Sequence, residues 1–295
     1  MALTIPCDSA KVATMDEYLE YVRKKVRFAD LDSIIASAPM LRSLANNRAM
    51  VLERMNSAVV ANFSGHYLRS AQAFELARDK DFFVRAAIWP PASSVATGRI
   101  YQEQFSYNVA HDHNFSFLTA NNLGPGYDTD LYEYDYEKAV GYVGELIDLR
   151  FIEKKRFGPG TVMLYRASKD VHIQHPPPEL TITLNLIWAP TEMRVRDQFT
   201  FDVDRKTISG YVSGGEADKR LSLLRMAGIL GDDQTRGLLD QISKTHPCRR
   251  TRLAAYSEMI RLSPGETEAI WRRATADPSA MVVREAKLQL ERLAT

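Results

Sequence analysis

The sequence has little cysteine, almost no net charge and no long apolar run. Its two cysteines, Cys7 and Cys248, stand far apart and form no C-x-x-C pair, so we expect neither a disulfide framework nor a thiolate zinc site. The 38 Lys and Arg residues balance 37 Asp and Glu residues, which gives a formal charge of +1. A chain with so little net charge has no overall field to attract a polyanion, so we expect no nucleic-acid partner.

The chain also lacks the patterns that direct a protein into or across a membrane. No run approaches the 18 or more apolar residues of a membrane span, and the N-terminal residues show no apolar core of a secretory signal. We therefore expect a cytoplasmic protein with no membrane partner. Its 295 residues, 45% hydrophobic and 25% charged, are typical of a globular protein with one large domain or two ordinary ones.

The spacing of apolar residues along the chain changes twice. Apolar residues recur at helical spacing over about 14–84, and a Trp-Pro-Pro run near residue 90 ends that pattern. Polar and β-branched or aromatic residues then alternate, with Gly-Pro-Gly at 124–126 and 158–160, which indicates a sheet. Helical spacing returns after Gly215. The sequence thus predicts an N-terminal helical segment, a β-barrel and a C-terminal helical segment, with bounds 1–98, 99–213 and 214–295.

The C-terminal segment carries a faint internal repeat. His246-Pro247 and Asp277-Pro278 lie 31 residues apart, and at the same offset Ala255 matches Ala286. This resembles a HEAT-type helical array. Because only two units match, we expect a helical cap packed on the barrel, with an ordinary antiparallel bundle as the alternative.

A His-x-His pair is the strongest functional signal. In the segment FSYNVAHDHNFSF the aromatic residues, Val109 and both histidines fall on odd positions, so a regular strand would place them on one face. Side chains at i and i+2 on a strand are close enough to bind one metal ion. A third ligand must come from another strand. His172 follows the turn and strand of GPGTVMLYRASKDVH, and His175 is a rival that we disfavour because three prolines follow it.

These residues resemble the two motifs of the cupin superfamily, over about Tyr101 to Leu186. The resemblance rests on HDHNF, on GPG with TVMLY, on His172 and on LTITLNL. It implies an α+β protein with a cupin-like β jelly-roll barrel and with His111, His113 and His172 as metal ligands. Cupins add a glutamate soon after His-x-His, but this chain has none there, so Glu133 is the candidate fourth ligand. The alternative is a three-histidine site, similar to that of thiol dioxygenases.

Three further side chains are candidates for chemistry. Glu133 could move a proton, although a carboxylate in this acidic run could equally face solvent. Tyr107 shares the predicted face of the histidines, so it could donate a hydrogen bond to substrate or serve as plain core. Arg166 could hold a carboxylate or form a surface ion pair. In LTITLNLIW the leucines alternate with Thr183 and Asn185, so one face of that strand is apolar, and which face lines the cavity stays open.

The resemblance implies a metal-dependent enzyme. We expect Fe(II), with Mn, Ni, Zn or Cu as alternatives, and O₂ as co-substrate in the oxidation of a small polar or amino-acid-like molecule. Two alternatives are a non-oxidative cupin, namely an isomerase, epimerase or lyase, and a non-catalytic binding cupin joined to a helical interaction module. We expect a small-molecule substrate and allow for a homodimer.

Overall fold

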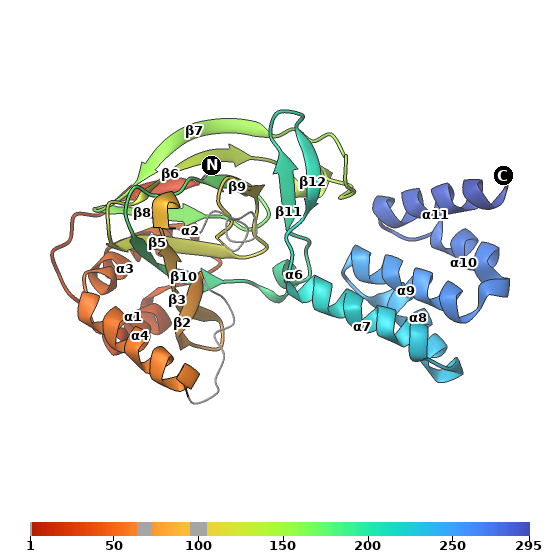
Figure 1. Ribbon diagram of the computed structural model, residues 1–295, viewed down its shortest axis with the longest axis horizontal. Coiled ribbons are helices and arrows are strands. Elements are labelled where there is room, and N and C mark those ends of the chain that lie inside the picture. The colour runs from red at the N-terminus through yellow and green to blue at the C-terminus, as the bar shows by residue number, and fades with distance from the viewer. Residues whose placement is uncertain (1, 64–71, 95–104) are drawn as a thin grey trace. The chain divides into compact units, whose positions relative to one another are not determined.

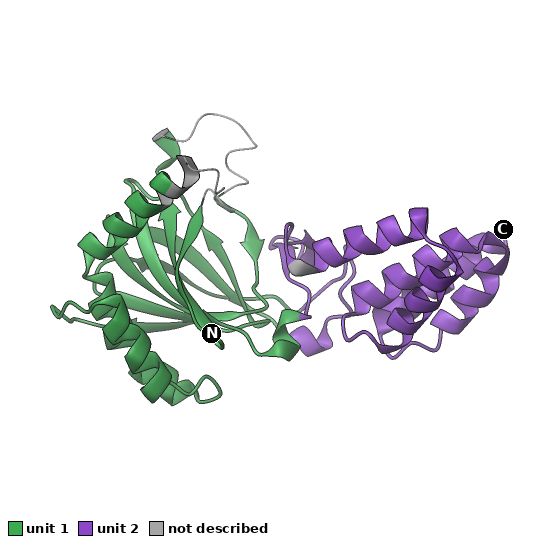
Figure 2. Ribbon diagram, turned by 90° about the horizontal axis from the view of Figure 1, so that it is seen from below, with its two compact units in different colours: residues 1–134, 148–194 green, residues 135–147, 195–295 purple. Residues whose placement is uncertain are grey.

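The computed structural model describes residues 2–63, 72–94 and 105–295, and the chain forms two compact units (Figure 2). Unit 1 comprises residues 1–134 and 148–194, and unit 2 comprises residues 135–147 and 195–295. The predicted boundary at residues 98 and 99 lies outside the described residues. The division of the chain into three parts by its sequence pattern stays a prediction.

Two antiparallel sheets form the framework of unit 1 (Figure 1). The first has the order β1-β8-β5-β10-β3-β2, and in unit 1 the second has the order β4-β9-β6-β7. The strands of the first sheet are β1 (Leu3–Pro6), β2 (Ala73–Arg78), β3 (Phe82–Trp89), β5 (Ser116–Leu123), β8 (Thr161–Tyr165) and β10 (Thr181–Trp188). Those of the second are β4 (Ala110–His111), β6 (Tyr127–Glu133), β7 (Arg150–Phe157) and β9 (Asp170–Gln174).

The strand order identifies a jelly roll. Within the sheets, the eight strands β3 to β10 form the two groups β3-β10-β5-β8 and β4-β9-β6-β7, so the chain passes repeatedly from one sheet to the other. Two four-stranded antiparallel sheets linked in this way are the jelly-roll arrangement, which cupins share. The prediction of an α+β fold around a cupin-like jelly roll is therefore confirmed.

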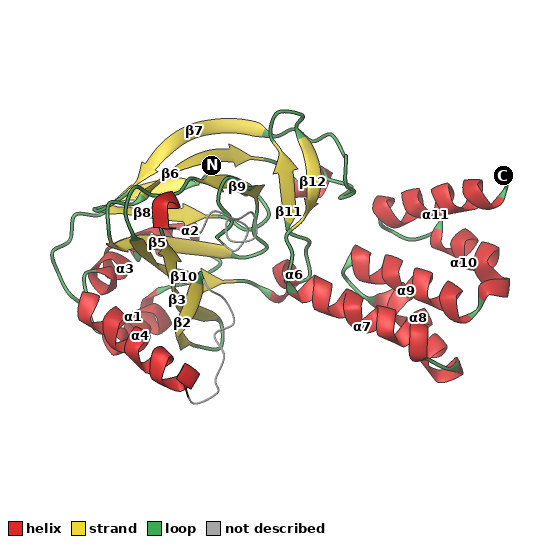
Figure 3. Cartoon of the chain, in the orientation of Figure 1, coloured by secondary structure: helices red, strands yellow, loops and turns green. Residues whose placement is uncertain are grey.

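Four helices cover the outer face of the first sheet: α1 (Met15–Lys25), α2 (Leu31–Ala36), α3 (Ala38–Ala45) and α4 (Arg48–Phe63) (Figure 3). Thr14 and Glu17 form a capping box that begins α1. Buried side chains such as Tyr18 and Leu41 pack against Leu184 and other outward-facing residues of the strands. A second apolar cluster, which includes Trp89, Phe117 and Tyr165, lies between the two sheets.

Two sequence predictions about elements are wrong. The helical pattern does not continue to residue 84, because the chain forms β2 from Ala73 and then β3, which pairs with β10 over its whole length. Pairing with β10 and burial thus outweigh the helical pattern predicted up to residue 84. The alternation in the sequence also predicts a strand over about 140–153, but the strand there, β7, begins only at Arg150, since Gly141 and Gly144 take positive φ angles of 95° and 88° that break a strand.

Unit 2 combines a short hairpin with helices. The hairpin pairs β11 (Phe199–Asp202) with β12 (Thr207–Tyr211). The α-helices are α7 (Glu216–Leu230), α8 (Asp233–Thr245), α9 (Arg249–Leu262), α10 (Thr267–Ala274) and α11 (Ala280–Leu293). A bidentate ion pair between Arg252 and Asp277, with N–O distances of 2.9 and 2.8 Å, is buried between the helices. The HEAT-type relation of these helices stays a prediction.

The short remaining elements are α6 (Thr191–Arg194) and three 3₁₀ turns, η1 (Ala92–Ser94), η2 (Tyr136–Lys138) and η3 (Pro264–Glu266). Among the described helices, none has the length and apolar composition to cross a bilayer.

Candidate metal centre

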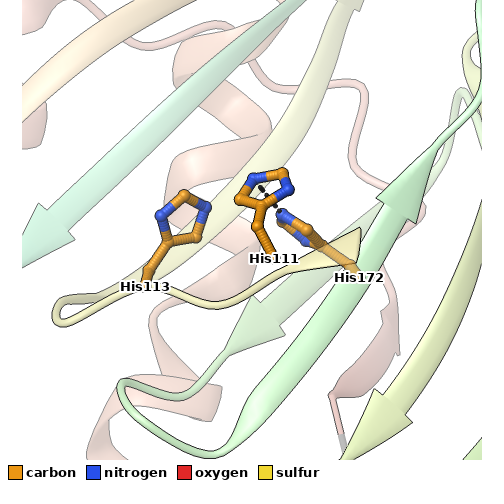
Figure 4. Close-up of side chains that lie close together, drawn as sticks. All are labelled: His111, His113 and His172. Carbon is orange, nitrogen blue, oxygen red and sulfur yellow. Dashed lines mark hydrogen bonds between the residues drawn. The ribbon is translucent and has the colours of Figure 1, made fainter. Parts of the chain in front are cut away.

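Three histidines from two neighbouring segments converge inside the barrel (Figure 4). His111 ends β4 and is paired in register with His172 of β9, and His113 follows two residues later. The Nε2 atoms of His111 and His172 are 3.1 Å apart. One ring nitrogen from each of the three residues lies within 4.8 Å of the others. The structure therefore brings together the three histidines that the sequence predicted as ligands.

The backbone around the His-x-His pair differs from the predicted single strand. Residues 105–117 are not one strand, because Ser106 and Asn108 take positive φ angles of 53° and 58°, and β4 holds only Ala110 and His111. A positive φ interrupts the alternation of a strand. The histidines nonetheless share a side, because a local i, i+2 relation at residues 111–113 is sufficient to place them together.

The local environment keeps His111 and His172 neutral. Burial lowers the pKa of His111, and the hydrogen bond between its Nδ1 and the Val109 carbonyl, at 2.9 Å, opposes this only in part. Burial lowers the pKa of His172 still further, and the nearby His111 and His113 act in the same direction. A metal ligand must be the neutral imidazole, so these shifts favour ligation.

The geometry of the group fits a metal ion. Two nitrogens bound to one ion at about 2.1 Å lie roughly 3 Å apart, which agrees with the Nε2 separation of His111 and His172. The Nδ1 of His111 faces a backbone carbonyl, an arrangement that fixes Nε2 as the atom with the free lone pair. Imidazoles suit Fe, Zn, Cu and Ni alike, so the donor set accommodates a transition metal without selecting one.

A cavity of about 110 Å³ contains the three histidines. Aromatic side chains of Trp89, Phe117 and Tyr127 form part of its wall, together with polar side chains. The two faces of β10 are now distinguished. Thr183 and Asn185 line this cavity, whereas Leu184 and its apolar neighbours pack beneath the helices.

Glu133 is not brought to the histidines. Its carboxylate pairs with Arg150 at 2.8 Å and with Arg166 and Lys169 at 3.3 Å each. It is also absent from the three-residue group of ligand atoms. The geometry of the described residues thus provides three histidines, and a role for Glu133 as ligand or acid stays a prediction.

The other sequence candidates also lie away from the group. The Tyr107 hydroxyl donates to the Pro90 carbonyl at 2.7 Å, and Arg166 pairs with Asp170 at 2.6 Å. His175, the rival third ligand, contacts Asp130 at 2.9 Å through its Nε2. Their proposed roles stay predictions, and none is supported by these contacts.

Sequence reasoning missed several polar residues that line the cavity, among them Arg85, Thr119 and Tyr127. Arg85 lies on β3, within the segment read as helical. Seven of the eight residues of FFVRAAIW are apolar, so a single charged residue within this run was the signal that could have marked Arg85. Burial raises the pKa of Tyr127 far above its ordinary value, so its hydroxyl keeps its proton.

No family model and no curated protein matches the sequence. Among solved structures, a DMSP lyase is similar over 40% of this chain and 46% of its own length. The two sequences are 15% identical there, and the TM-score is 0.25. Hydroquinone 1,2-dioxygenase from Sphingomonas sp. TTNP3, with 4-hydroxybenzoate bound, matches with 7% identity, 42% of this chain, 69% of its own and a TM-score of 0.26. A cupin domain from Bordetella pertussis Tohama I matches over its whole length and 42% of this chain, with 8% identity and a TM-score of 0.23.

Likenesses this distant say nothing about activity, and the match spans less than half of the DMSP lyase. The fold is assigned on the order of the strands in this chain. By that order, unit 1 is a jelly roll with a three-histidine group in its interior.

Proposed function

We propose that this chain is a metal-dependent enzyme of cupin type, and that it is a non-haem Fe(II) oxygenase or dioxygenase acting on a small polar molecule. The observation that carries the proposal is the convergence of His111, His113 and His172 inside a cavity. These side chains would hold the ion, which would supply redox chemistry with O₂ as co-substrate.

The cavity wall favours redox chemistry over proton abstraction. Among the described residues that line it, none is Asp or Glu, and the pKa of Tyr127 is raised, so that side chain is a poor general base. The Tyr127 hydroxyl accepts a hydrogen bond from the Gln174 amide at 3.2 Å, which leaves its own proton to be donated.

A second candidate is a non-oxidative lyase, isomerase or epimerase, in which the ion acts as a Lewis acid. One observation favours it: the Tyr127 hydroxyl lies in the same cavity as the histidines and could protonate a leaving group or a developing anion. In this alternative Tyr127 replaces Tyr107 and Glu133 as the group that moves a proton. A non-catalytic binding cupin is the third.

The test is metal content and turnover of full-length protein purified without oxygen. We expect close to one Fe(II) per chain after reconstitution, and O₂ uptake that depends on both iron and substrate. Substrates to screen are small carboxylic acids and amino acids. Turnover without O₂ consumption, supported equally by a redox-silent ion, would instead establish the lyase or isomerase alternative.

A matched pair of variants makes the test specific. His172→Ala should lose the metal, because it removes one of three ligands. His175→Ala should keep it, because that side chain contacts Asp130 rather than the group. Equal metal content in both variants and in the wild type would overturn the proposed site. A wild-type protein that binds no transition metal would overturn the proposed function as well.

A further inference from the structure

A charged side chain that has no counter-ion among the described residues opens into the cavity. Arg85 lies on β3 and lines the same cavity as the three histidines. Its Nε is buried and has no hydrogen-bond partner, and no Asp or Glu among the described residues forms an ion pair with it. Burial lowers the pKa of Arg85 to about 10, an effect that the nearby Tyr127 opposes, so the side chain is still positively charged at neutral pH.

The carboxylate of Glu75, which pairs with Arg85 in the sheet, forms hydrogen bonds with Arg78 instead. Glu75 of β2 is the register partner of Arg85, so its backbone lies directly beside that of Arg85. Its carboxylate, however, accepts hydrogen bonds from Arg78, with an Nε–Oε1 distance of 3.0 Å, and Glu75 is exposed. Within the described part of the chain, the guanidinium of Arg85 faces the ring of Phe115, whose centre is 5.8 Å from the guanidinium carbon. A ring at that distance offsets little of the free-energy cost of desolvating the Arg85 cation.

The hydroxyl of Thr119 is a second buried polar group on the same face of the sheet. Asn185 of β10 is paired in register with Arg85 on one side and with Thr119 of β5 on the other. These three residues therefore form a row across the sheet, and all three line the cavity. The Thr119 hydroxyl is buried and has no hydrogen-bond partner among the described residues. The buried Nε of Arg85 and the buried hydroxyl of Thr119 thus have no partner among the described residues, and a polar ligand would satisfy both, because unpaired buried polar groups are costly.

We propose that Arg85 and Thr119 bind the carboxylate of a small substrate whose remaining atoms face the histidines. The proposal deepens the proposed function, because it names the class of molecule that the site takes. A guanidinium binds a carboxylate through two parallel N–H groups, which fixes the orientation of the ligand as well as its charge. Thr119 would donate a further hydrogen bond to one carboxylate oxygen.

The size of the cavity limits the substrate. An apolar cavity of roughly 150 Å³ accommodates benzene, so the 110 Å³ here suits a ligand of about six non-hydrogen atoms or fewer. A short aliphatic carboxylate fits this limit. A phosphate would carry a second charge, for which the described wall offers no further Lys or Arg.

The experiment measures binding to metal-free, full-length protein, which prevents a carboxylate from binding to the ion. The probes are acetate, propanoate and butanoate up to about 100 mM, each compared with its neutral amide, and inorganic phosphate. Binding is followed by isothermal titration calorimetry and by the thermal transition. We expect at least one carboxylate to bind and its amide not to bind.

The variants assign the binding to Arg85. Arg85→Gln should weaken carboxylate binding by about 10- to 150-fold, the range for hydrogen bonds to charged groups, and Arg85→Lys should restore part of it. Thr119→Val should also weaken it by about 10-fold or more, because its hydroxyl would donate to the same charged carboxylate. The control is Arg156→Gln, because Arg156 is exposed and pairs with Asp128 at 3.2 Å.

The outcomes separate this proposal from the proposed function. Carboxylate binding that depends on Arg85 supports the inference even if the reconstituted protein turns over no substrate. The proposal is overturned if no carboxylate binds, if the amides bind equally well, if Arg85→Gln has no effect, or if phosphate binds at this cavity in preference to the carboxylates. Metal binding and O₂ uptake remain separate measurements in each of these cases.

Discussion

Replacement of Arg85 by methionine is expected to stabilise the ligand-free protein. Methionine is similar in length and fills the same space without a charge. In the folded protein the Arg85 cation lacks a counter-ion among the described residues, whereas in the unfolded chain water solvates it. The substitution therefore removes an unfavourable term from the folded state only, so the free energy of unfolding rises.

The size of the effect follows from the pKa of Arg85. Burial, partly opposed by Tyr127, lowers it from 12.5 to about 10, and each unit of pKa corresponds to about 1.4 kcal/mol. That gives an upper limit of about 3 kcal/mol, which we reduce to about 1–3 kcal/mol because the side chain is partly exposed. At neutral pH the charge is present in both states, so the full difference applies there. The thermal transition should rise by about 2–4 °C for each kcal/mol.

The measurement is urea unfolding at pH 7 with and without a bound carboxylate. Arg78→Met is the control, because that arginine is exposed and pairs with Glu75, so we expect a change within about 0.5 kcal/mol. The gain at Arg85 should shrink when a carboxylate is present, since only the wild type binds it. A less stable Arg85→Met protein would refute the reasoning and would indicate that the charge has a partner within the chain.

Three further predictions follow from the structure. Because the pKa values of His111 and His172 are lowered in the folded state, the unfolded chain binds more protons below about pH 6.5, so metal-free protein should lose stability as the pH falls through that value in a pH series of urea titrations. Gly126→Ala should destabilise by about 1–3 kcal/mol or more, seen as a lower thermal transition, because φ is 82° and a Cβ would lie 1.8 Å from a backbone oxygen of β7. Asp277→Ala should cost about 3–5 kcal/mol by the same assay, since it leaves Arg252 buried without its carboxylate, whereas an apolar replacement of both residues should cost much less.

The three histidines could be found from sequence because their relation is mostly local. His111 and His113 are two residues apart, and this spacing alone puts them on one side even though the predicted strand is interrupted. His172 was distinguishable from His175 because the prolines after His175 indicate the end of a strand. The jelly-roll prediction rested in the same way on strand-length patterns, which predict strands over about 128–136, 161–166 and 180–188, close to the observed β6, β8 and β10.

Arg85 could not be found in this way, because its significance depends on the lack of a counter-ion among the described residues of the folded chain. Pairing of β3 with β10 brings it to the cavity, and this pairing joins residues about 100 positions apart in the chain. Glu133 was selected from the sequence, but its surroundings could not be predicted from it. The sequence places it in an acidic run, and only the fold reveals that Arg150, Arg166 and Lys169, from other segments, surround its carboxylate. Long-range pairing of charges is not encoded in local spacing.

The two-sided burial of β10 has a consequence for how the chain tolerates change. Ile182, Leu184 and Leu186 face the helices, whereas Thr183 and Asn185 face the cavity. In a saturation library scored separately for soluble yield and for ligand response, neighbouring positions of this strand should alternate between the two phenotypes. A substrate preference could then be altered at residues 183 and 185 while residues 182, 184 and 186 are held constant, so a single eight-residue strand offers separate access to folding and to specificity.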